Sequence, residues 1–227
     1  MFDWLRNGGC GNWTVLLTAL LLAGCGGEPA ENDADPPASE VAAPAQAAGP
    51  RRLLLADFEP FQTEETTWRE EDGILICTGT PKGYIHTRDA YGNYVWEAEY
   101  RFAPVEDEAK RPLANSGFMI HIQEPHKVWP ASLEVQGRWD QMASIKSNGG
   151  IPDLTIDDNP EARESARKPV GEWNHVRIES RDGALTAWLN GEKICTSQPG
   201  ELTSGQIGLQ SEGYEVHFRN LTIERVE

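Results

Sequence analysis

The stretch that decides the fold is Tyr94–Phe102, which reads YVWEAEYRF. The residues with even numbers are Tyr, Trp, Ala, Tyr and Phe, and they alternate with Val, Glu, Glu and Arg. Successive side chains of a β-strand point to opposite faces of the sheet, so this alternation predicts a strand with one face in the core and one polar face. Trp96 therefore belongs to the predicted core.

Shorter runs on either side repeat the pattern. Gly117–Gln123 reads GFMIHIQ, and its alternation predicts that His121 points away from the core. Leu133–Gln136 reads LEVQ, which predicts Glu134 and Gln136 on the same polar face. Further strands are predicted over Gly73–Thr78, Trp173–Glu179, Ala184–Leu189, Gln206–Gln210 and Val216–Glu224.

Turn signals separate these strands. Asp182-Gly183 and Asn190-Gly191 predict hairpin turns because both dipeptides tolerate positive φ. Helical periodicity is weak throughout, although Pro160–Lys168 predicts one or two turns of helix. Regularly spaced short strands without intervening helices predict an all-β sandwich or barrel, with Trp173 as well as Trp96 in its core.

Residues 1–24 predict an export signal that is not part of the fold. Arg6 supplies a basic start, and the apolar run Trp13–Leu22 is too short to span a bilayer, which takes about 20 helical residues. The following Leu22-Ala23-Gly24-Cys25 resembles a bacterial lipobox, in which small residues precede a lipid-modified cysteine. We therefore expect acyl chains on Cys25 that hold the protein on a membrane. The alternative is an ordinary signal peptide followed by a chance cysteine.

The residues after this cysteine predict the location and the start of the folded part. Gly26, rather than Asp, follows Cys25, which resembles the default sorting of bacterial lipoproteins to the outer membrane of the cell envelope. Residues 25–50 are rich in Ala, Pro and acidic side chains and contain almost no large apolar residue, so they cannot offset the entropy of ordering. We expect residues 25–50 to be a disordered tether and residues 51–227 to form one domain.

Net charge and cysteine usage restrict the partners and the cross-links. The chain has 36 acidic and 20 basic residues and a formal net charge of −16, which repels phosphate backbones, so nucleic acid is not an expected partner. Cys77 and Cys195 remain in the predicted domain. An oxidising compartment permits a disulfide between them, and the alternative is that both are small buried hydrophobic residues.

Eight short segments occur in an order and spacing that are specific as a set. They are Asn115-Ser116-Gly117-Phe118, His121-Ile122-Gln123, Val128-Trp129-Pro130, Leu133-Glu134-Val135-Gln136, Gly171-Glu172-Trp173-Asn174, Trp188-Leu189-Asn190-Gly191, Gly205-Gln206-Ile207-Gly208-Leu209-Gln210 and Phe218-Arg219-Asn220. The set resembles the DUF1080 family, now called 3-keto-disaccharide hydrolases, from about Leu54 to Ile223. The resemblance implies a concanavalin A-like jelly roll, a sandwich of two antiparallel sheets, in agreement with the strand pattern.

The resemblance also implies an activity, namely cleavage of glycosides already oxidised at C3. The C3 ketone acidifies the proton at C2, so that a base removes this proton and the glycosidic oxygen at C1 leaves by elimination. Water added afterwards completes a net hydrolysis. The protein must place a base within hydrogen-bond reach of C2–H, and donors or a cation at the enolate oxygen.

Polar residues on the predicted strand faces are candidates for these roles. Glu134 is the first choice, as the base or as a ligand of a divalent metal that polarises the ketone, and His121 would share proton transfer or metal binding. Arg101 is a candidate donor to the enolate, although Glu99 on the same strand face would neutralise it in the simplest interpretation. The expected contacts with the carbohydrate substrate are Glu99, Arg101, Asn115, Trp129, Gln136, Trp188 and Gln210, with the tryptophans stacked on sugar rings.

The spacing of acidic residues argues against an ordinary glucanase. Jelly-roll glucanases typically place three acids at i, i+2 and i+4 of one strand, whereas this stretch reads Glu134-x-Gln136-x-Arg138. Without the family, Glu134 would be a solvated carboxylate and His121 a structural histidine. Three hypotheses stay open: an enzyme that cleaves 3-keto-glycosides, a lectin-like sugar-binding module without catalysis, and a purely structural surface domain.

Overall fold

The computed structural model describes residues 49–227 of the chain. The predicted signal peptide, the predicted lipidation site Cys25 and nearly all of the predicted tether lie outside the described residues. Between residues 49 and 227, no helix has both the length and the apolar character that crossing a membrane requires.

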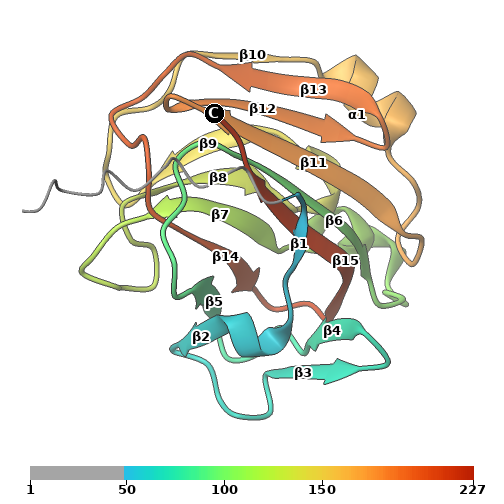
Figure 1. The fold of residues 1–227 in the computed structure, drawn as a ribbon. Coiled ribbons are helices and arrows are strands. Elements are labelled where there is room, and N and C mark those ends of the chain that lie inside the picture. Colours follow the sequence, from blue (N-terminus) through green and yellow to red (C-terminus); the bar gives the residue numbers. More distant parts are fainter. Residues whose placement is uncertain (1–48) are drawn as a thin grey trace, which may run out of the picture. The chain divides into compact units, whose positions relative to one another are not determined.

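Two antiparallel sheets form the domain (Figure 1). The larger sheet has nine strands in the order β10-β13-β12-β11-β6-β15-β4-β3, with β1 paired to β15, and the smaller has six in the order β2-β5-β14-β7-β8-β9. Strands of the larger sheet are β1 Arg51–Arg52, β3 Trp68–Glu71, β4 Ile74–Cys77, β6 Tyr94–Phe102, β10 Ile156–Asp158, β11 Asn174–Arg181, β12 Ala184–Leu189, β13 Glu192–Ser197 and β15 Val216–Arg225. Strands of the smaller sheet are β2 Phe58–Phe61, β5 Gly83–Thr87, β7 Gly117–Ile122, β8 Ser132–Gln136, β9 Ile145–Asn148 and β14 Gln206–Ser211. This arrangement confirms the predicted pair of antiparallel sheets.

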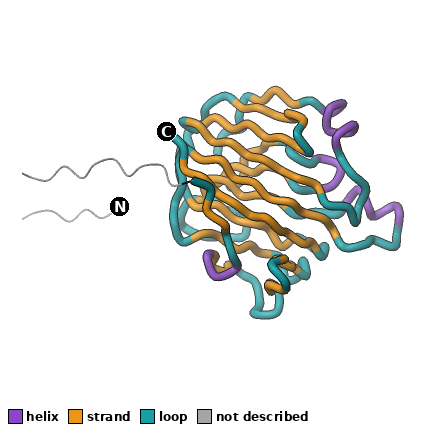
Figure 2. Tube along the Cα trace, turned by 45° about the vertical axis from the view of Figure 1, so that its right-hand side comes forward, coloured by secondary structure: helices purple, strands orange, loops and turns teal. Residues whose placement is uncertain are grey.

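The helical segments are short and lie at the periphery of the sheets (Figure 2). The α-helix α1, Pro160–Ala166, falls inside the predicted helical stretch. It begins there because the Asn159 side chain accepts a hydrogen bond from the Ala162 backbone N–H, and because Pro160 suits the first turn. The 3₁₀ segments are η1 Leu55–Asp57, η2 Glu108–Leu113 and η3 Trp139–Gln141.

The predicted alternation and turns are confirmed in the larger sheet. Strands β6 and β12 begin and end at the predicted residues. The turn between β11 and β12 has φ of 49° at Asp182 and 82° at Gly183, and the turn after β12 has φ of 50° at Asn190 and 92° at Gly191. Both are the positive-φ hairpins that these dipeptides favour.

An aromatic contact joins the two sheets. The ring of Phe118 on β7 meets Trp96 and Tyr100 on β6 edge-on, with ring centroids 5.2 and 5.5 Å apart. It meets Phe218 on β15 in the same way at 6.0 Å. All four side chains are buried, so Phe118 packs the smaller sheet against the larger one.

Trp173 lies outside the core that was predicted to contain it, whereas the two cysteines lie in the core. Trp173 is not in the core, because the buried Asn174 takes the inward position at the start of β11 and Trp173 points outward between Arg101 and Arg219. Cys77 and Cys195 are free and buried, so they are small core residues and not a disulfide. Burial raises the pKa of Cys77 to about 11 and that of Cys195 to about 12, and both thiols stay protonated at neutral pH.

Replacing Phe118 with Ala should remove the contact between the sheets and lower the free energy of unfolding by about 3–5 kcal/mol, since it leaves a cavity among three aromatic rings. Denaturant unfolding followed by tryptophan fluorescence measures this loss. Phe118→Leu, which retains most of the volume, should cost less than half as much. Equal losses in the two variants would show that packing at Phe118 does not hold the sheets together.

Candidate functional site

Five of the predicted site residues lie on the outer face of the smaller sheet, the face directed away from the larger sheet. Leu133 and Val135 of β8 pack in the core between the sheets, so Glu134 points outward. Glu134 is nevertheless only 1% exposed. Every residue of β8 and of the adjacent β7 is buried, which means that the smaller sheet is covered on both faces around Glu134.

Side chains from two strands hold the Glu134 carboxylate. Asn148 on β9 donates its Nδ2–H to Glu134 Oε2 at 2.6 Å, and Gln210 on β14 donates its Nε2–H to the same oxygen at 2.9 Å. Lys146 on β9 places its Nζ 3.1 Å from Glu134 Oε1. Two donors and a cation replace the water that a buried carboxylate loses.

Gly117 on β7 allows Glu134 and Gln210 to meet, although β7 lies between their strands. A Cβ at this position would lie 2.4 Å from Gln210 Oε1 and 2.7 Å from Glu134 Oε1. Both of these oxygens are buried. Within residues 49–227, Gln210 Oε1 accepts no hydrogen bond, and Glu134 Oε1 has the Lys146 ammonium group as its neighbour. Two acceptor oxygens thus fill the space above Gly117 that a side chain would otherwise occupy.

A pocket of about 130 Å³ opens beside Glu134. Its walls are Trp129, Glu134, Lys146, Asn148, Gln210 and Glu212. Glu212 follows β14, and its Oε2 accepts a hydrogen bond from Asn115 Nδ2 at 2.5 Å. Burial and then the charge of Glu134 raise the pKa of the Glu212 carboxyl. The pocket therefore contains two carboxyl groups in different surroundings.

The segment between β7 and β8, residues 123–131, folds over this face. The ring of His126 stacks on His86 with centroids 4.2 Å apart, and its Nδ1 lies 2.8 Å from the hydroxyl of Tyr84. The other ring nitrogen lies 2.8 Å from Glu124 Oε1. These contacts fix the segment that carries Trp129 to the pocket.

Two more of the predicted contacts lie on the same face. The Gln136 side chain is 4% exposed, and its Oε1 accepts a hydrogen bond from the Arg138 backbone N–H at 2.8 Å. Asn115 binds Glu212 as described. The structure therefore gathers five of the residues predicted from the sequence: Asn115, Trp129, Glu134, Gln136 and Gln210.

His121 does not reach the pocket, because β7 contains a bulge. Gln206 of β14 pairs with Ile122, while Gly208, two residues on, pairs with Met119, three residues back. The extra residue on β7 accompanies a positive φ of 52° at His121. A bulge of this kind exchanges the two faces of the strand beyond it.

The bulge turns the His121 ring into the core between the sheets. Its Nδ1 lies 2.9 Å from the carbonyl oxygen of Leu202, and its Nε2 lies 3.2 Å from Ser180 Oγ on β11. The ring also meets Tyr94 edge-on. The expectation that His121 shares a face with Glu134 is therefore wrong, and the predicted catalytic pair does not form.

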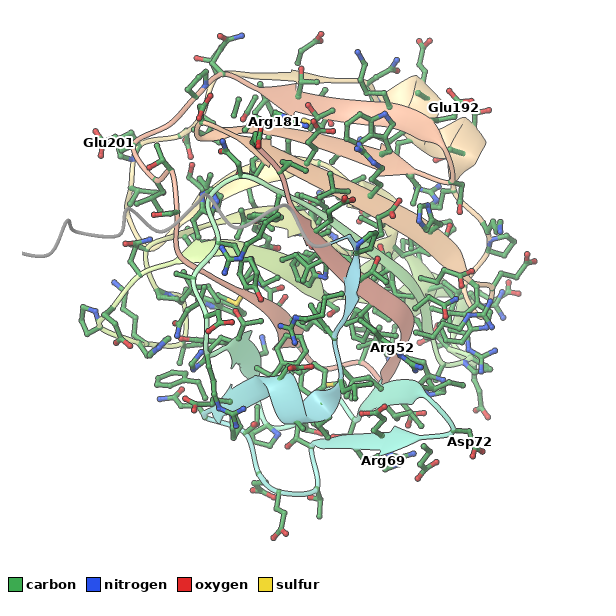
Figure 3. The ribbon with its side chains drawn as sticks, viewed as in Figure 1. Arg52, Arg69, Asp72, Arg181, Glu192 and Glu201 are labelled. Carbon is green, nitrogen blue, oxygen red and sulfur yellow. The ribbon has the colours of Figure 1, made fainter. Side chains whose placement is uncertain are left out.

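Glu99, Arg101 and Trp188 lie on the outer face of the larger sheet, so the expectation that they join Glu134 is wrong as well. Glu99 accepts two hydrogen bonds from the Arg219 guanidinium at 3.0 and 3.1 Å. Trp188 stacks on Arg177 at 4.3 Å. This surface continues in the ion pair of Arg181, labelled in Figure 3, with Glu179. Alternation correctly predicted Glu99 and Arg101 outside the core, but the whole sandwich separates the face of all three residues from Glu134.

Three residues of the pocket were not predicted from the sequence. Lys146 and Asn148 belong to the short strand β9, whose sequence IKSN has no strong strand pattern. Glu212 lies just beyond the predicted strand that ends at Gln210. The available signal was the i, i+2 spacing, which places Lys146 with Asn148 and Gln210 with Glu212 on common faces.

The metal site hypothesised from Glu134 and His121 does not fit these side chains. The two lie on opposite faces of the smaller sheet. The Lys146 ammonium group lies 3.1 Å from Glu134 Oε1, where it would repel a divalent cation bound there. Over residues 49–227, no group of three His, Cys, Asp or Glu side chains is placed to hold a metal ion.

Comparisons with known proteins agree with this architecture. A family described as 3-keto-alpha-glucoside-1,2-lyase-like domains matches residues 55–224, which confirms the resemblance noted above. No sequence among curated proteins matches the chain. A structure from Parabacteroides distasonis named "putative glycosyl hydrolase" is 21% identical with a TM-score of 0.56, covering 76% of this chain and 89% of that one. The carbohydrate-binding module CBM66 from Bacillus subtilis is 12% identical with a TM-score of 0.54, covering 74% and 95%. These two likenesses show a shared fold.

The placement of His121 predicts a pH dependence of stability. Burial lowers the pKa of His121 below its ordinary 6.5, so the fold favours the neutral ring. Its contribution is present above pH 6.5 and is lost as the pH falls through 6.5 toward the lowered value. His121→Gln retains a donor but takes up no proton. The decrease in unfolding free energy between pH 7 and pH 5, measured with urea, should be smaller in this variant than in the wild type. Parallel curves would place His121 in contact with water.

Proposed function

We propose that this chain, which belongs to the family of 3-keto-alpha-glucoside-1,2-lyase-like domains, cleaves glycosides that carry a ketone at C3 of the sugar. The observation that supports this proposal is the buried Glu134 carboxylate in a polar pocket beside a tryptophan. Such a pocket combines a base, hydrogen-bond partners for sugar hydroxyls and an apolar surface for a sugar ring.

Glu134 would act as the base that removes the proton at C2. Its two hydrogen bonds, from Asn148 and Gln210, fix the carboxylate and leave Oε1 directed over Gly117. Proton transfer from carbon moves the negative charge from Glu134 onto the enolate oxygen at C3. Lys146, 3.1 Å from Oε1, would remain in the pocket as the cation that offsets this charge. Lys146 thereby takes the role that the sequence suggested for Arg101.

The remaining side chains would orient the sugar. Trp129 supplies an aromatic face, on which the C–H groups of a sugar ring can stack. The unpartnered Oε1 of Gln210 accepts from a hydroxyl group, and Asn115 and Gln136 border the same face. Positioning of the substrate beside Glu134 supplies much of the rate, because a small displacement of C2–H from the base slows the transfer.

Glu134→Gln tests this assignment. The variant retains the size of the side chain but removes the base, so the turnover of a 3-keto-disaccharide should fall about 10²–10⁴-fold. The released sugar is measured by chromatography. Glu99→Gln is the matched control, because Glu99 lies on the outer face of the other sheet, and this variant should retain wild-type turnover. Saturable binding of the 3-keto-disaccharide without any product from the wild-type protein would contradict the enzyme and favour a sugar-binding module.

We also propose that the domain works at the bacterial cell envelope, held by lipid on Cys25. The support is the sequence Leu22-Ala23-Gly24-Cys25, followed by an acidic, proline-containing tether. As a flexible coil, residues 25–50 would span roughly 25–30 Å, enough to hold the domain clear of a membrane surface.

Cys25→Ala should abolish the attachment. Expressed with its full N-terminus in a bacterium, the wild-type chain should incorporate labelled palmitate and remain in the membrane fraction. The variant should incorporate no label and leave that fraction, because no acyl chain remains to hold it. Cys10→Ala, which lies within the predicted signal, is the control and should behave as the wild type. Unlabelled wild-type protein would leave the ordinary signal peptide as the explanation.

A further inference from the structure

The pocket beside Glu134 contains a second carboxyl group, that of Glu212. Glu212 lines the same pocket as Glu134 and follows β14, the strand that carries Gln210. Its Oε2 accepts the hydrogen bond from Asn115 Nδ2, which fixes the orientation of the carboxyl group. Within residues 49–227, no other hydrogen bond to the Glu212 side chain is present, so Oε1 is free to carry a proton.

The two carboxyl groups have opposite surroundings. Glu134 is held by two hydrogen-bond donors and by the Lys146 ammonium group. Glu212 has one neutral donor, is largely desolvated and faces the negative charge of Glu134, and burial and that charge raise its pKa. Lys146, Lys82 and Arg138 act in the opposite direction on Glu212, and their effects are smaller. One pocket thus contains a carboxylate suited to accept a proton and a carboxylic acid suited to donate one.

Resting on the proposed function, we infer that Glu212 is the catalytic acid that protonates the departing glycosidic oxygen. Of the six residues that line the pocket, only Glu134 and Glu212 are carboxyl groups. Amide side chains such as those of Asn148 and Gln210 do not release protons at neutral pH. Lys146 is the ion-pair partner of Glu134 and is needed as a cation throughout the reaction.

These two carboxyl groups are sufficient for the proton transfers of the elimination. Glu134 takes the proton from C2, and the electrons of that C–H bond form the enolate with C3. When the enolate collapses, the C3 ketone returns, a double bond forms between C1 and C2, and the C1–O bond breaks. The departing oxygen keeps the bonding electrons and takes the proton of Glu212.

Addition of water restores both groups. Glu212, now a carboxylate, takes a proton from water while the water oxygen bonds to C1. Glu134 returns its proton to C2. Each carboxyl group ends in the state in which it began, so no further acid, base or oxidant is required.

Two substrates with different leaving groups test the inference: a 3-keto-glucoside of a simple alcohol and its 4-nitrophenyl counterpart. An alkoxide leaves poorly without a proton, whereas 4-nitrophenolate needs little help. Glu212→Gln retains an oxygen for the Asn115 hydrogen bond and loses only the proton. Its kcat/KM should fall about 10²–10⁴-fold on the alkyl glycoside and less than about 10-fold on the nitrophenyl glycoside.

Three controls separate the possible outcomes. Glu134→Gln should lose activity equally on both substrates, since both require removal of the C2 proton. Glu215→Gln, an exposed residue three positions further along the chain, should behave as the wild type. Glu212→Asp, which retains an acid, should recover part of the alkyl activity and guards against a folding defect in the glutamine variant. Equal losses on both substrates in Glu212→Gln would overturn the role of Glu212, whereas a wild-type protein that cleaves neither substrate would overturn the proposed function itself.

Discussion

Burial of the Glu134 charge constrains the strands around it. Removing a carboxylate from water costs several kcal/mol unless donors and an opposite charge replace the lost hydration. Here the replacements come from both sides, with Asn148 and Lys146 on β9 and Gln210 on β14. The contact from β14 exists only because Gly117 on the strand between them has no side chain. One buried charge therefore determines residue types on three strands besides its own.

The same burial explains which strands were predictable. β6 alternates because one face of the larger sheet packs in the core and the other meets solvent, so its bounds follow from the sequence. β5, Gly83–Thr87, is buried at all five positions and offers no alternation to detect. β9 is short and polar because its side chains serve Glu134, and it too went unpredicted.

The candidate residues predicted from the sequence are divided between different faces for an equally physical reason. Alternation predicts whether a side chain points into the core or away from it. It does not predict which of the two sheets contains the strand. Glu99 and Arg101 were correctly predicted outside the core, yet they lie on the opposite side of the molecule from Glu134. His121 was misplaced because one extra residue in β7 exchanges the faces, and no residue in GFMIHIQ announces the bulge.

The two carboxyl groups of the pocket lie on different strands, because the residues that follow Glu134 along its own strand are not acidic. In jelly-roll glucanases, acids on one strand typically serve as nucleophile and proton donor of the two-carboxylate hydrolysis. At i+2 from Glu134 this chain has Gln136, which carries no charge, and at i+4 it has Arg138, which pairs with Asp140. Glu134 thus has no acidic neighbour on its strand and is surrounded by hydrogen-bond donors, in agreement with the role of base proposed for it. The second acid lies instead at the end of β14, where burial and the charge of Glu134 favour its protonated form. The two roles proposed for these carboxyl groups require opposite protonation states at the same pH, and the surroundings of the two groups differ accordingly.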